Sequence, residues 1–299
     1  MEETDWIAAD WGNTHLRLWA ISLSGAVVGE RKVAKGLSSL EPDDWEGALL
    51  ETCEGLLPEG QTTEVLICGA AGSRGGWMEV PHRAVPCLPV SADGAVAVPT
   101  TDPRLSVRIL TGLKQLDPPA VMRSEETQVA GYLAANPGFD GVISLPGTHT
   151  KWVHVSAGEV VSFLSTMTGE LFGLLANQSI LRRTIAAQGD DEAAFLEGVE
   201  AAIRDPGKLL NKLITLRARA YLDGLDPVAG RSYLSGLLIG ADLTASRAYW
   251  LGRDVAVVGA EAIAHSYALA LEAQGVAVHK ADGGEMALAG LIAAHAQIR

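Results

Sequence analysis

The 299-residue sequence predicts an α/β protein built from two related lobes. The first observation behind this prediction is a repeated pattern, a glycine turn followed by Thr-His-x-Arg or Thr-His-x-Lys, at residues 12–17 and 147–151. The second is the order of elements, because a β-meander, a helix, a strand and a helix occur twice along the chain. A turn of this composition suits a polyanion, so the repeat indicates a phosphotransferase with a cleft between its lobes.

The first half contains signals for each element of the first lobe. We expect strands at 6–11, 14–22 and 26–33, a helix at 42–57, a buried strand at 65–68 and a glycine-rich loop at 69–76. Pro42 and the two acids after it suit the first turn of that helix. Residues 77–120 are proline-rich, and we expect them to be irregular, with short strands. Ser124 is expected to cap a helix that runs to about Ala135.

The second half repeats the meander and continues with helices. We expect strands at 141–145, 150–155 and 159–165, helices at 169–187, 190–204, 206–222 and 229–251, a strand at 254–258, a helix at 260–273, a strand at 276–279 and a helix at 284–297. The segment Asn-Pro-Gly-Phe-Asp at 136–140 predicts the lobe boundary. The two domains are therefore expected at 1–137 and 138–299, with the last helix packing back on the first lobe.

Composition excludes several classes of function. The formal net charge of −13 argues against nucleic acid or an anionic membrane as a partner. The three cysteines show no Cys-x-x-Cys pair, so neither a disulfide framework nor a zinc site is expected, and a reducing cytoplasm is the simplest location. The N-terminus lacks a signal-peptide pattern, and the apolar run at 234–239 is far shorter than the roughly 20 residues of a membrane span.

The first hairpin carries residues that suit phosphate and metal. Asp10 ends an apolar strand, where a carboxylate can hold Mg²⁺ through water. Gly12 and Asn13 form the turn, and glycine lets the backbone N–H groups approach phosphate oxygens. Thr14 adds a hydroxyl, and Arg17 adds positive charge at the same edge. A plain hairpin with a turn aspartate and a solvated arginine is the alternative, and the second copy of the pattern argues against it.

The second hairpin offers the same groups to the other end of a polyphosphate. Gly147 and Thr148 correspond to the first turn, and Lys151 supplies the charge. His149 and His15 occupy matching places, where we expect them to orient the backbone rather than transfer protons. The usual motifs of P-loop, dinucleotide-binding, serine-hydrolase and zinc-protease sites do not occur in the sequence.

Longer motifs in the same order extend this pattern over nearly the whole chain. They are Asp10-Trp11-Gly12-x-Thr14-x-Leu16-Arg17, Gly69-x-x-Gly72-Ser73-x-x-Gly76-Trp77, Arg123-x-Glu125-Glu126-Thr127-Gln128, Pro146-Gly147-Thr148-His149-x-Lys151-Trp152-Val153, Phe163, Met167-Thr168-Gly169-Glu170-Leu171, Leu234-Ser235-Gly236-Leu237-Leu238-Ile239-Gly240-Ala241 and Val257-x-Gly259. The chain resembles the actin-like sugar kinase superfamily in its phosphate-1, phosphate-2 and adenosine motifs. More narrowly, it resembles the 2-dehydro-3-deoxygalactonokinase family.

The resemblance implies a two-lobed, ribonuclease H-like fold of the actin and hexokinase type, with an interlobe cleft. It also implies ATP and Mg²⁺ as cofactors and phosphorylation of the terminal 6-hydroxyl of 2-dehydro-3-deoxy-D-galactonate in galactonate breakdown. Gly259 and Ala260, which open a helix after a buried strand, would then face the adenosine. The nucleotide would bind to the C-terminal lobe and the sugar acid to the N-terminal lobe.

Phosphoryl transfer also needs a carboxylate that orients or deprotonates the attacking hydroxyl. Glu126 is the first choice for this base, because related sugar kinases carry an Asp followed by Thr at the equivalent helix start. Glu125 and Asp10 remain alternatives, and acids in a first helical turn also occur simply as partners of the helix dipole. The residues expected to bind the anionic substrate are Gly72, Ser73, Arg74, Arg123 and Glu170.

Other functions stay open on the same scaffold. The run at 10–14 also resembles one type of pantothenate kinase, although the second hairpin lacks the aspartate expected there. A kinase specific for 2-dehydro-3-deoxygluconate and a non-catalytic sugar sensor are further alternatives, and no basic DNA-binding segment precedes Trp6. The apolar helices within 169–251 are candidates for the face of a homodimer.

Overall fold

The computed structural model of the chain describes residues 2–91 and 94–298. The chain divides into two compact units. The first unit contains the residues up to Phe139, the segment Val155–Ser162 and the C-terminal segment from Gly283. The second unit contains Asp140–His154 and Phe163–Asp282. Each unit has its own sheet and its own hydrophobic core.

The first unit is built on a six-stranded sheet with the order β3-β2-β1-β4-β7-β6 and a three-stranded sheet with the order β5-β8-β9. Its elements are β1 (Trp6–Trp11), β2 (Leu16–Ile21), β3 (Val27–Val33), α1 (Trp45–Thr52), β4 (Thr63–Gly69), β5 (His82–Ala84), β6 (Ala95–Val98), β7 (Leu105–Leu110), β8 (Gly112–Leu116), β9 (Pro119–Met122), α2 (Glu125–Ala135) and α9 (Gly283–Ile298). Strand β1 is antiparallel to β2 and parallel to β4, and β4 is parallel to β7.

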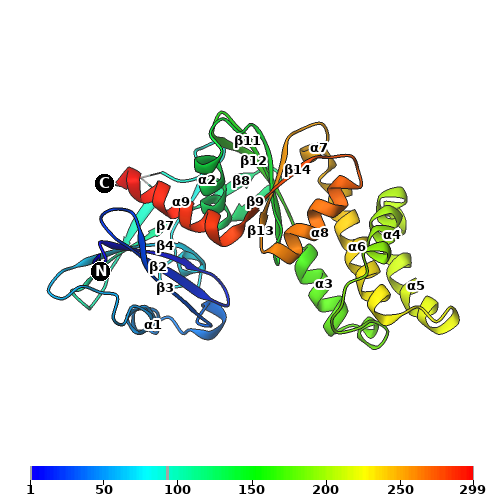
Figure 1. The fold of residues 1–299 in the computed structure, drawn as a ribbon, viewed down its shortest axis with the longest axis horizontal. Coiled ribbons are helices and arrows are strands. Elements are labelled where there is room, and N and C mark those ends of the chain that lie inside the picture. Colours follow the sequence, from blue (N-terminus) through cyan, green and yellow to red (C-terminus); the bar gives the residue numbers. More distant parts are fainter. Residues whose placement is uncertain (1, 92–93, 299) are drawn as a thin grey trace. The chain divides into compact units, whose positions relative to one another are not determined.

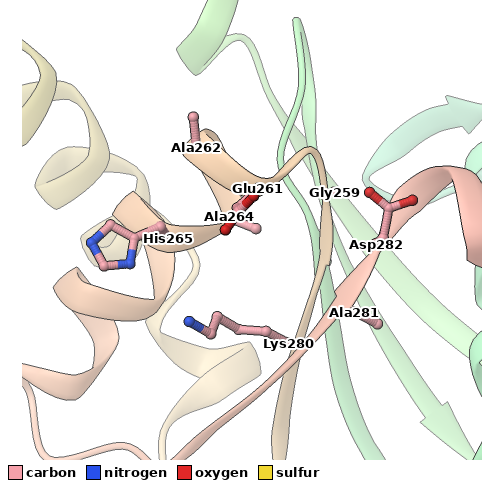
Figure 2. Close-up of a pocket in the computed structure, with 8 residues that line it drawn as sticks. All are labelled: Gly259, Glu261, Ala262, Ala264, His265, Lys280, Ala281 and Asp282. Carbon is pink, nitrogen blue, oxygen red and sulfur yellow. The ribbon is translucent and has the colours of Figure 1, made fainter.

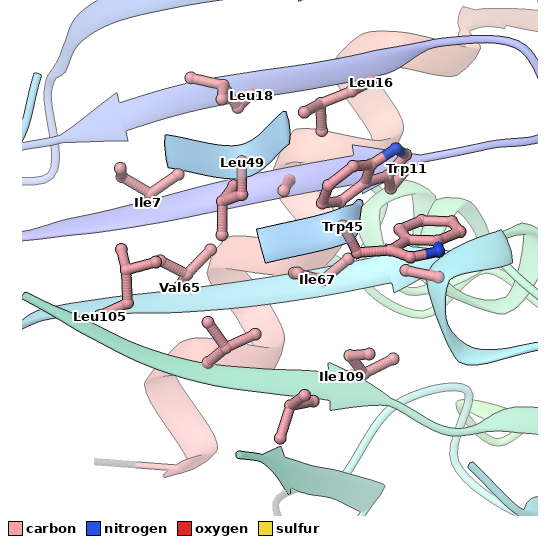
Figure 3. Packing of buried hydrophobic residues seen from close by; sticks show 14 of the residues in the cluster. Ile7, Trp11, Leu16, Leu18, Trp45, Leu49, Val65, Ile67, Leu105 and Ile109 are labelled. Atoms are coloured by element: carbon pink, nitrogen blue, oxygen red, sulfur yellow. The ribbon is translucent and has the colours of Figure 1, made fainter. Parts of the chain in front are cut away.

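The two-residue period of the strands decides which side chains face each helix. In β1, Ile7 and Trp11 pack in the cluster that includes Trp45 and Leu49 of α1. Figure 3 shows the rings of Trp11 and Trp45 next to each other in this cluster, with centroids 4.7 Å apart. The alternate residues of β1, such as Ala8, pack against α2 and α9 on the opposite face. Asp10 belongs to this second set by its position in the strand.

Helices α2 and α9 lie side by side (Figure 1) and approach through glycines. A Cβ on Gly131 would lie 1.9 Å from the carbonyl oxygen of Met286, and one on Gly290 would lie 1.8 Å from that of Thr127. Neither glycine can accept a side chain unless the two helices separate. The C-terminal helix therefore sets the position of α2, which begins with the two glutamates of the predicted site.

The second sheet has five strands in the order β12-β11-β10-β13-β14. The remaining elements are β10 (Gly141–Leu145), β11 (Thr150–Ser156), β12 (Glu159–Thr166), α3 (Thr168–Asn177), α4 (Glu192–Arg204), α5 (Leu209–Leu222), α6 (Pro227–Ala245), α7 (Arg247–Trp250), β13 (Val255–Gly259), α8 (Glu261–Glu272) and β14 (Val278–Asp282). Strand residues such as Val255 and Val257 share one apolar cluster with Phe195, Ile239 and Leu271 of the helices. Helices α4 and α6 lie side by side within the second unit (Figure 1).

The two sheets share one strand order. In each, three consecutive strands are ordered third-second-first, and two later strands extend the sheet beyond the first, so β3-β2-β1-β4-β7 corresponds to β12-β11-β10-β13-β14. In the second sheet, β10 is parallel to β13 and β13 to β14, as in the first. The predicted α/β class and the duplication are therefore confirmed.

Residues 77–120 contain the expected short strands, but the sequence analysis gave no bounds for the most buried of them. Strand β7 is mostly buried and pairs in parallel with β4 in the middle of the sheet. Prolines flank this strand but do not interrupt it, since Pro103 and Pro118 lie outside its bounds. The alternation of Leu105, Val107 and Ile109 was the overlooked signal.

Candidate active site

Asp10 lies at the end of β1 on the face covered by α2. In the sheet register it lies beside Cys68 of β4, and the Cys68 thiol donates a hydrogen bond to Asp10 Oδ1 over 3.6 Å. The Ser124 hydroxyl donates to the same oxygen over 3.0 Å. Burial raises the pKa of Asp10, and these two hydrogen bonds only partly offset that effect. A nearby cation would favour the ionised form of this carboxylate.

Ser124 precedes α2, but its side chain does not cap the helix as predicted. Its φ of 89° is in the left-handed region, and its hydroxyl is bound to Asp10 instead. In a helix cap the side chain of Ser124 would accept from a backbone N–H of the helix. Here the backbone N–H of Ser124 instead donates to a side chain of the helix, to Glu126 Oε1 over 3.0 Å. This strained backbone links the carboxylate of β1 to the start of α2.

Glu126 is completely buried. Its Oε1 accepts hydrogen bonds from the backbone N–H of Ser124 and from the Thr127 hydroxyl, whereas its Oε2 has no hydrogen-bond partner within residues 2–91 and 94–298. Burial, together with the charge of Glu125, raises the pKa of Glu126 to about 8. A buried carboxylate oxygen without a hydrogen-bond partner destabilises a folded protein, so it indicates a group that forms a hydrogen bond with a bound ligand.

Arg123 lies beside these glutamates and shows a matching feature. Its Nη2 donates to the carbonyl oxygen of Val80 over 2.8 Å and lies 3.1 Å from His82 Nε2. Burial and the charge of Arg123 lower the pKa of His82, so this ring is a neutral acceptor. The buried Nη1 of Arg123 has no hydrogen-bond partner in the described part of the chain. The carboxylate of Glu125, the residue before Glu126, accepts a hydrogen bond from the backbone N–H of Arg123 over 2.9 Å.

The glycine-rich loop contributes to the same region through Gly72. A Cβ on Gly72 would lie 2.7 Å from Arg123 Nη1, so glycine is required where the guanidinium packs. The Ser73 hydroxyl donates to the carbonyl oxygen of Ala70 over 2.6 Å. Arg74 is exposed. The structure thus brings Gly72 together with Arg123, while Ser73 is bound to its own loop.

The first glycine turn, residues 12–15, connects β1 to β2. The N–H of Gly12 donates to the carbonyl oxygen of His15 over 2.9 Å, and Asn13, Thr14 and His15 are exposed. A Cβ on Gly12 would meet only the His15 oxygen, at 3.8 Å, which is ordinary contact. Packing within the first unit therefore does not explain this glycine. Arg17 pairs with Asp10 in the sheet register, and its guanidinium forms an ion pair with Glu30 at 2.9 Å.

A second glycine supports this turn from behind. A Cβ on Gly36 would lie 2.4 Å from the backbone of Asn13 and Thr14. The next residues, Leu37 and Ser38, donate their N–H groups to the carbonyl oxygens of Gly12 and Asn13. The turn is thus held by backbone contacts on its inner side, and its outer side remains exposed.

The second glycine turn, residues 147–149, has the same construction. A Cβ on Gly147 would meet only the carbonyl oxygen of His149, at 3.8 Å, and all three residues are exposed. The supporting glycine is Gly169 at the start of α3, whose Cβ would lie 2.2 Å from the Gly147 oxygen. The N–H of Glu170 donates to the carbonyl oxygen of Thr148 over 2.9 Å, and its carboxylate binds His149 Nε2 at 2.6 Å.

Lys151 was expected to present its charge to phosphate, and the structure places it in β11 with only 5% of its surface exposed. Gly259 ends β13 beside the second turn, since its Cβ would lie 3.3 Å from the carbonyl oxygen of Pro146. The exposed Ala260 then precedes α8. The ends of β10 and β13 therefore bring the second turn and the predicted adenosine motif together.

An open hollow of about 680 Å³ adjoins Gly259 in the second unit. It is lined by Gly259, Glu261, Ala262, Ala264, His265, Lys280, Ala281 and Asp282. Figure 2 shows Lys280 and His265 at one end of the hollow and Asp282 at the other, near Gly259. A second hollow of about 490 Å³ shares Ala262 and His265 with it. The volume of each suits a small molecule.

The predicted site residues thus form two groups. The first unit contains Asp10, Gly12, Asn13, Thr14, Arg17, Gly72, Ser73, Arg74, Arg123, Glu125 and Glu126, and the second contains Gly147, Thr148, His149, Lys151, Glu170, Gly259 and Ala260. Sequence reasoning missed the supporting role of Gly36 and Gly169 and the contacts of Cys68 with Asp10. Gly169 stood inside a recognised motif, whereas no local pattern marks Gly36.

A duplicated sheet with a glycine turn between the first two strands of each copy defines the fold class of the protein, a duplicated α/β fold that also occurs in a crystal structure assigned as a sugar-acid kinase. A family model described as 2-keto-3-deoxy-galactonokinase matches residues 10–294. The chain belongs to this family, which makes it a phosphotransferase that acts on a sugar acid.

Individual relatives agree over their full length. The chain is 36% identical to a Rhizobium meliloti (strain 1021) protein named probable 2-dehydro-3-deoxygalactonokinase DgoK1, covering 96% of this chain and 95% of the relative. It is 31% identical to the 2-dehydro-3-deoxygalactonokinase of Escherichia coli (strain K12), covering 96% of each. The crystal structure of a Sinorhizobium meliloti protein assigned as the same kinase matches with a TM-score of 0.91 and 35% identity, covering 98% of this chain and 96% of that one.

Component A of the (R)-2-hydroxyglutaryl-CoA dehydratase of Acidaminococcus fermentans shares the fold alone. Its TM-score is 0.56 at 15% identity, with 98% of each chain covered.

Within residues 2–91 and 94–298, no helix combines the length and the apolar character that crossing a membrane requires.

Proposed function

We propose that the protein transfers the γ-phosphoryl group of ATP to the terminal 6-hydroxyl of 2-dehydro-3-deoxy-D-galactonate, in galactonate breakdown. The product is 2-dehydro-3-deoxy-6-phospho-D-galactonate. The first unit binds the sugar acid and the second binds the nucleotide. The protein acts in the cytoplasm, without nucleic acid or membrane as a partner, and forms a homodimer.

The observation that carries this proposal is the pair of glycine turns. Gly12 and Gly147 both have room for a Cβ, and neither has a positive φ. Their backbone conformation and neighbours in the described chain would therefore permit alanine. A ligand that approaches the backbone closely explains both glycines, and backbone N–H groups at a glycine turn suit phosphate oxygens.

The donor set of the site fits Mg²⁺ held largely by water and phosphate. Within the described residues, no group of three or more metal-ligating side chains gathers at one place. Mg²⁺ in phosphoryl-transfer sites is usually bound by one or two carboxylates together with substrate phosphates. Asp10 is the carboxylate that would hold it, since it lies near the end of β1, two residues before Gly12 of the first turn. The bound ion would neutralise charge on the transferred phosphoryl group.

Glu126 is the residue that we assign as the base. Its pKa of about 8 lies close to neutral pH, where a general base is most effective. Its Oε2 keeps an unused acceptor position for the hydroxyl proton. Glu125 remains the alternative base, because it is less buried than Glu126. It ranks second because one of its carboxylate oxygens is already bound to the backbone N–H of Arg123.

Arg123 is the group that we assign to the anionic end of the substrate. Its Nη1 keeps an unused donor while its Nη2 is fixed by Val80 and His82. A guanidinium held in this way can bind a carboxylate or a 2-oxo group without first being ordered. Gly72, Ser73 and Arg74 complete the proposed substrate set of the first unit, whereas Glu170 belongs to the second unit, where its carboxylate binds His149.

The test is a kinase assay that follows ADP release with three acceptors in parallel. We expect turnover with 2-dehydro-3-deoxy-D-galactonate, slower turnover with the gluconate-derived acid and none with pantothenate. Phosphorus NMR of the product should place the phosphate on the terminal carbon. ADP release that is independent of any acceptor, or equal with all three, would contradict the proposal.

A further inference from the structure

A buried carboxylate lies behind the second glycine turn, and the proposed mechanism does not use it. Asp242 belongs to α6 and exposes only 3% of its surface. Its Oδ1 accepts from the indole N–H of Trp152 over 3.0 Å. Its Oδ2 accepts from the hydroxyls of Thr166 over 2.9 Å and Thr168 over 2.8 Å, and from the hydroxyl of Tyr267.

The four donors come from separate elements that converge on the turn. Trp152 belongs to β11, which leaves the turn, and Tyr267 belongs to α8, which follows Gly259. Thr166 ends β12, and Thr168 is the first residue of α3. One side chain therefore connects the strand after the turn, the helix that supports the turn and the helix of the adenosine motif.

The connection reaches the turn itself by two routes. Through Thr168, the carboxylate holds the start of α3. There Gly169 packs against the carbonyl oxygen of Gly147, and the N–H of Glu170 donates to the carbonyl oxygen of Thr148. Through Tyr267, it reaches Thr150, whose hydroxyl lies 2.8 Å from the Tyr267 oxygen. Burial and the charge of Asp242 raise the pKa of Tyr267, so the Tyr267 hydroxyl stays protonated and donates a hydrogen bond to the carboxylate.

A buried carboxylate with four donors is a constraint on geometry, because each donor can satisfy it from one direction only. Hydrogen bonds to an ionised acceptor are also about twice as strong as neutral ones. We propose that Asp242 is a positioning residue that fixes the second glycine turn in the shape that binds nucleotide phosphates. The inference rests on the proposed function in one respect, namely that this turn receives the phosphates.

The test compares two variants of the network with one matched control. Asp242→Asn keeps the size of the side chain but replaces one accepting oxygen by an NH₂ group. Thr168→Val removes the hydroxyl at the start of α3, and with it the hydrogen bond to Asp242 and the contact with the Thr166 hydroxyl. Ser246→Ala is the control, because the buried Ser246 hydroxyl donates to the backbone oxygen of Asp242 over 2.8 Å and does not contact the network.

The first measurement is calorimetric titration with MgADP. We expect Asp242→Asn and Thr168→Val to weaken MgADP binding at least about tenfold, which corresponds to about 1.4 kcal/mol. In kinetic assays, the KM for ATP should rise while the KM for the sugar acid stays within about twofold. Ser246→Ala should leave both constants unchanged. A loss of stability alone would not separate the two KM values.

The second measurement is amide hydrogen exchange at residues 147–150, which does not depend on catalysis. Faster exchange in the two network variants and unchanged exchange in Ser246→Ala support the proposal. If all three variants bind MgADP like the wild type and exchange at the same rate, Asp242 has no positioning role, and the kinase function is unaffected. If the wild type does not bind MgADP, the proposed function fails, and the exchange rates alone decide the role of Asp242.

Discussion

The buried carboxyl group of Glu126 makes the stability of the protein depend on pH in a defined direction. Its pKa of about 8 lies above the ordinary value of 4.5. The native state therefore holds a proton that the unfolded chain has released between these two values. Stability from this group is fully present below pH 4.5 and is lost as the pH rises through about 8. At about 1.4 kcal/mol for each pH unit, the effect amounts to about 5 kcal/mol.

The perturbation that isolates this effect is Glu126→Gln, because glutamine resembles the protonated acid and does not titrate. The variant should gain stability relative to the wild type as the pH rises from 5.5 to 9. For a domain of this size, 1 kcal/mol moves Tm by about 2–4 °C, so the Tm difference should change by about 10 °C. Glu54→Gln, at an exposed position of the same unit, is the matched control.

The assay is thermal unfolding followed by tryptophan fluorescence at pH 5.5, 7 and 9. A Tm difference between Glu126→Gln and the wild type that stays constant over this range would refute the reasoning. It would mean that Glu126 is ionised in the native protein throughout. The same variant should lower kcat by at least about 100-fold if Glu126 is the base, with little change in the KM for the sugar acid.

Three further predictions follow from the contacts of the site. Asp10→Asn should lower kcat by orders of magnitude without lowering Tm by more than a few degrees, since the amide can still accept from Ser124; activity near the wild-type level over a range of Mg²⁺ concentrations would exclude its role in holding the metal. Gly147→Ala should fold normally but raise the KM for ATP at least about tenfold. Gly169→Ala should also lower Tm, because its methyl group would collide with the turn, and equal Tm values for the two variants would contradict this distinction. Arg123→Lys keeps the positive charge but loses the fixed guanidinium, so it should raise the KM for the sugar acid at least about tenfold and leave the KM for ATP unchanged. The opposite pattern in initial-rate kinetics would assign Arg123 to the nucleotide.

The sequence predicted the features of the fold that depend on local patterns. The alternation in β1 and β2, the glycine turns at 12 and 147 and the helices of the second unit follow from periodicity and turn chemistry. Strand β7 was missed because flanking prolines obscured a six-residue alternation. The strands that extend the sheet beyond β1 were less predictable, since β4 and β7 come from distant parts of the chain.

The parts of the site that could not be predicted depend on contacts between distant residues. Ser124 has the sequence pattern of a helix cap, but Asp10 lies 114 residues earlier and takes its hydroxyl. The position of α2 depends on its close packing against α9, and no pattern near residue 126 reveals that contact. Asp242 follows a recognised motif directly, yet its four partners lie between 25 and 90 residues away.

The close contact between α2 and α9 has a consequence for how the molecule is made. The second unit is synthesised between residues 140 and 282, so it can fold while the first is still incomplete. Helix α2, which begins with Glu125 and Glu126, gains its neighbour only once residues 283–298 have been synthesised. A chain that stops at Asp282 would therefore keep its second unit but lack the neighbour of α2, the helix that carries the base we propose, so we expect activity only once the last segment has been translated.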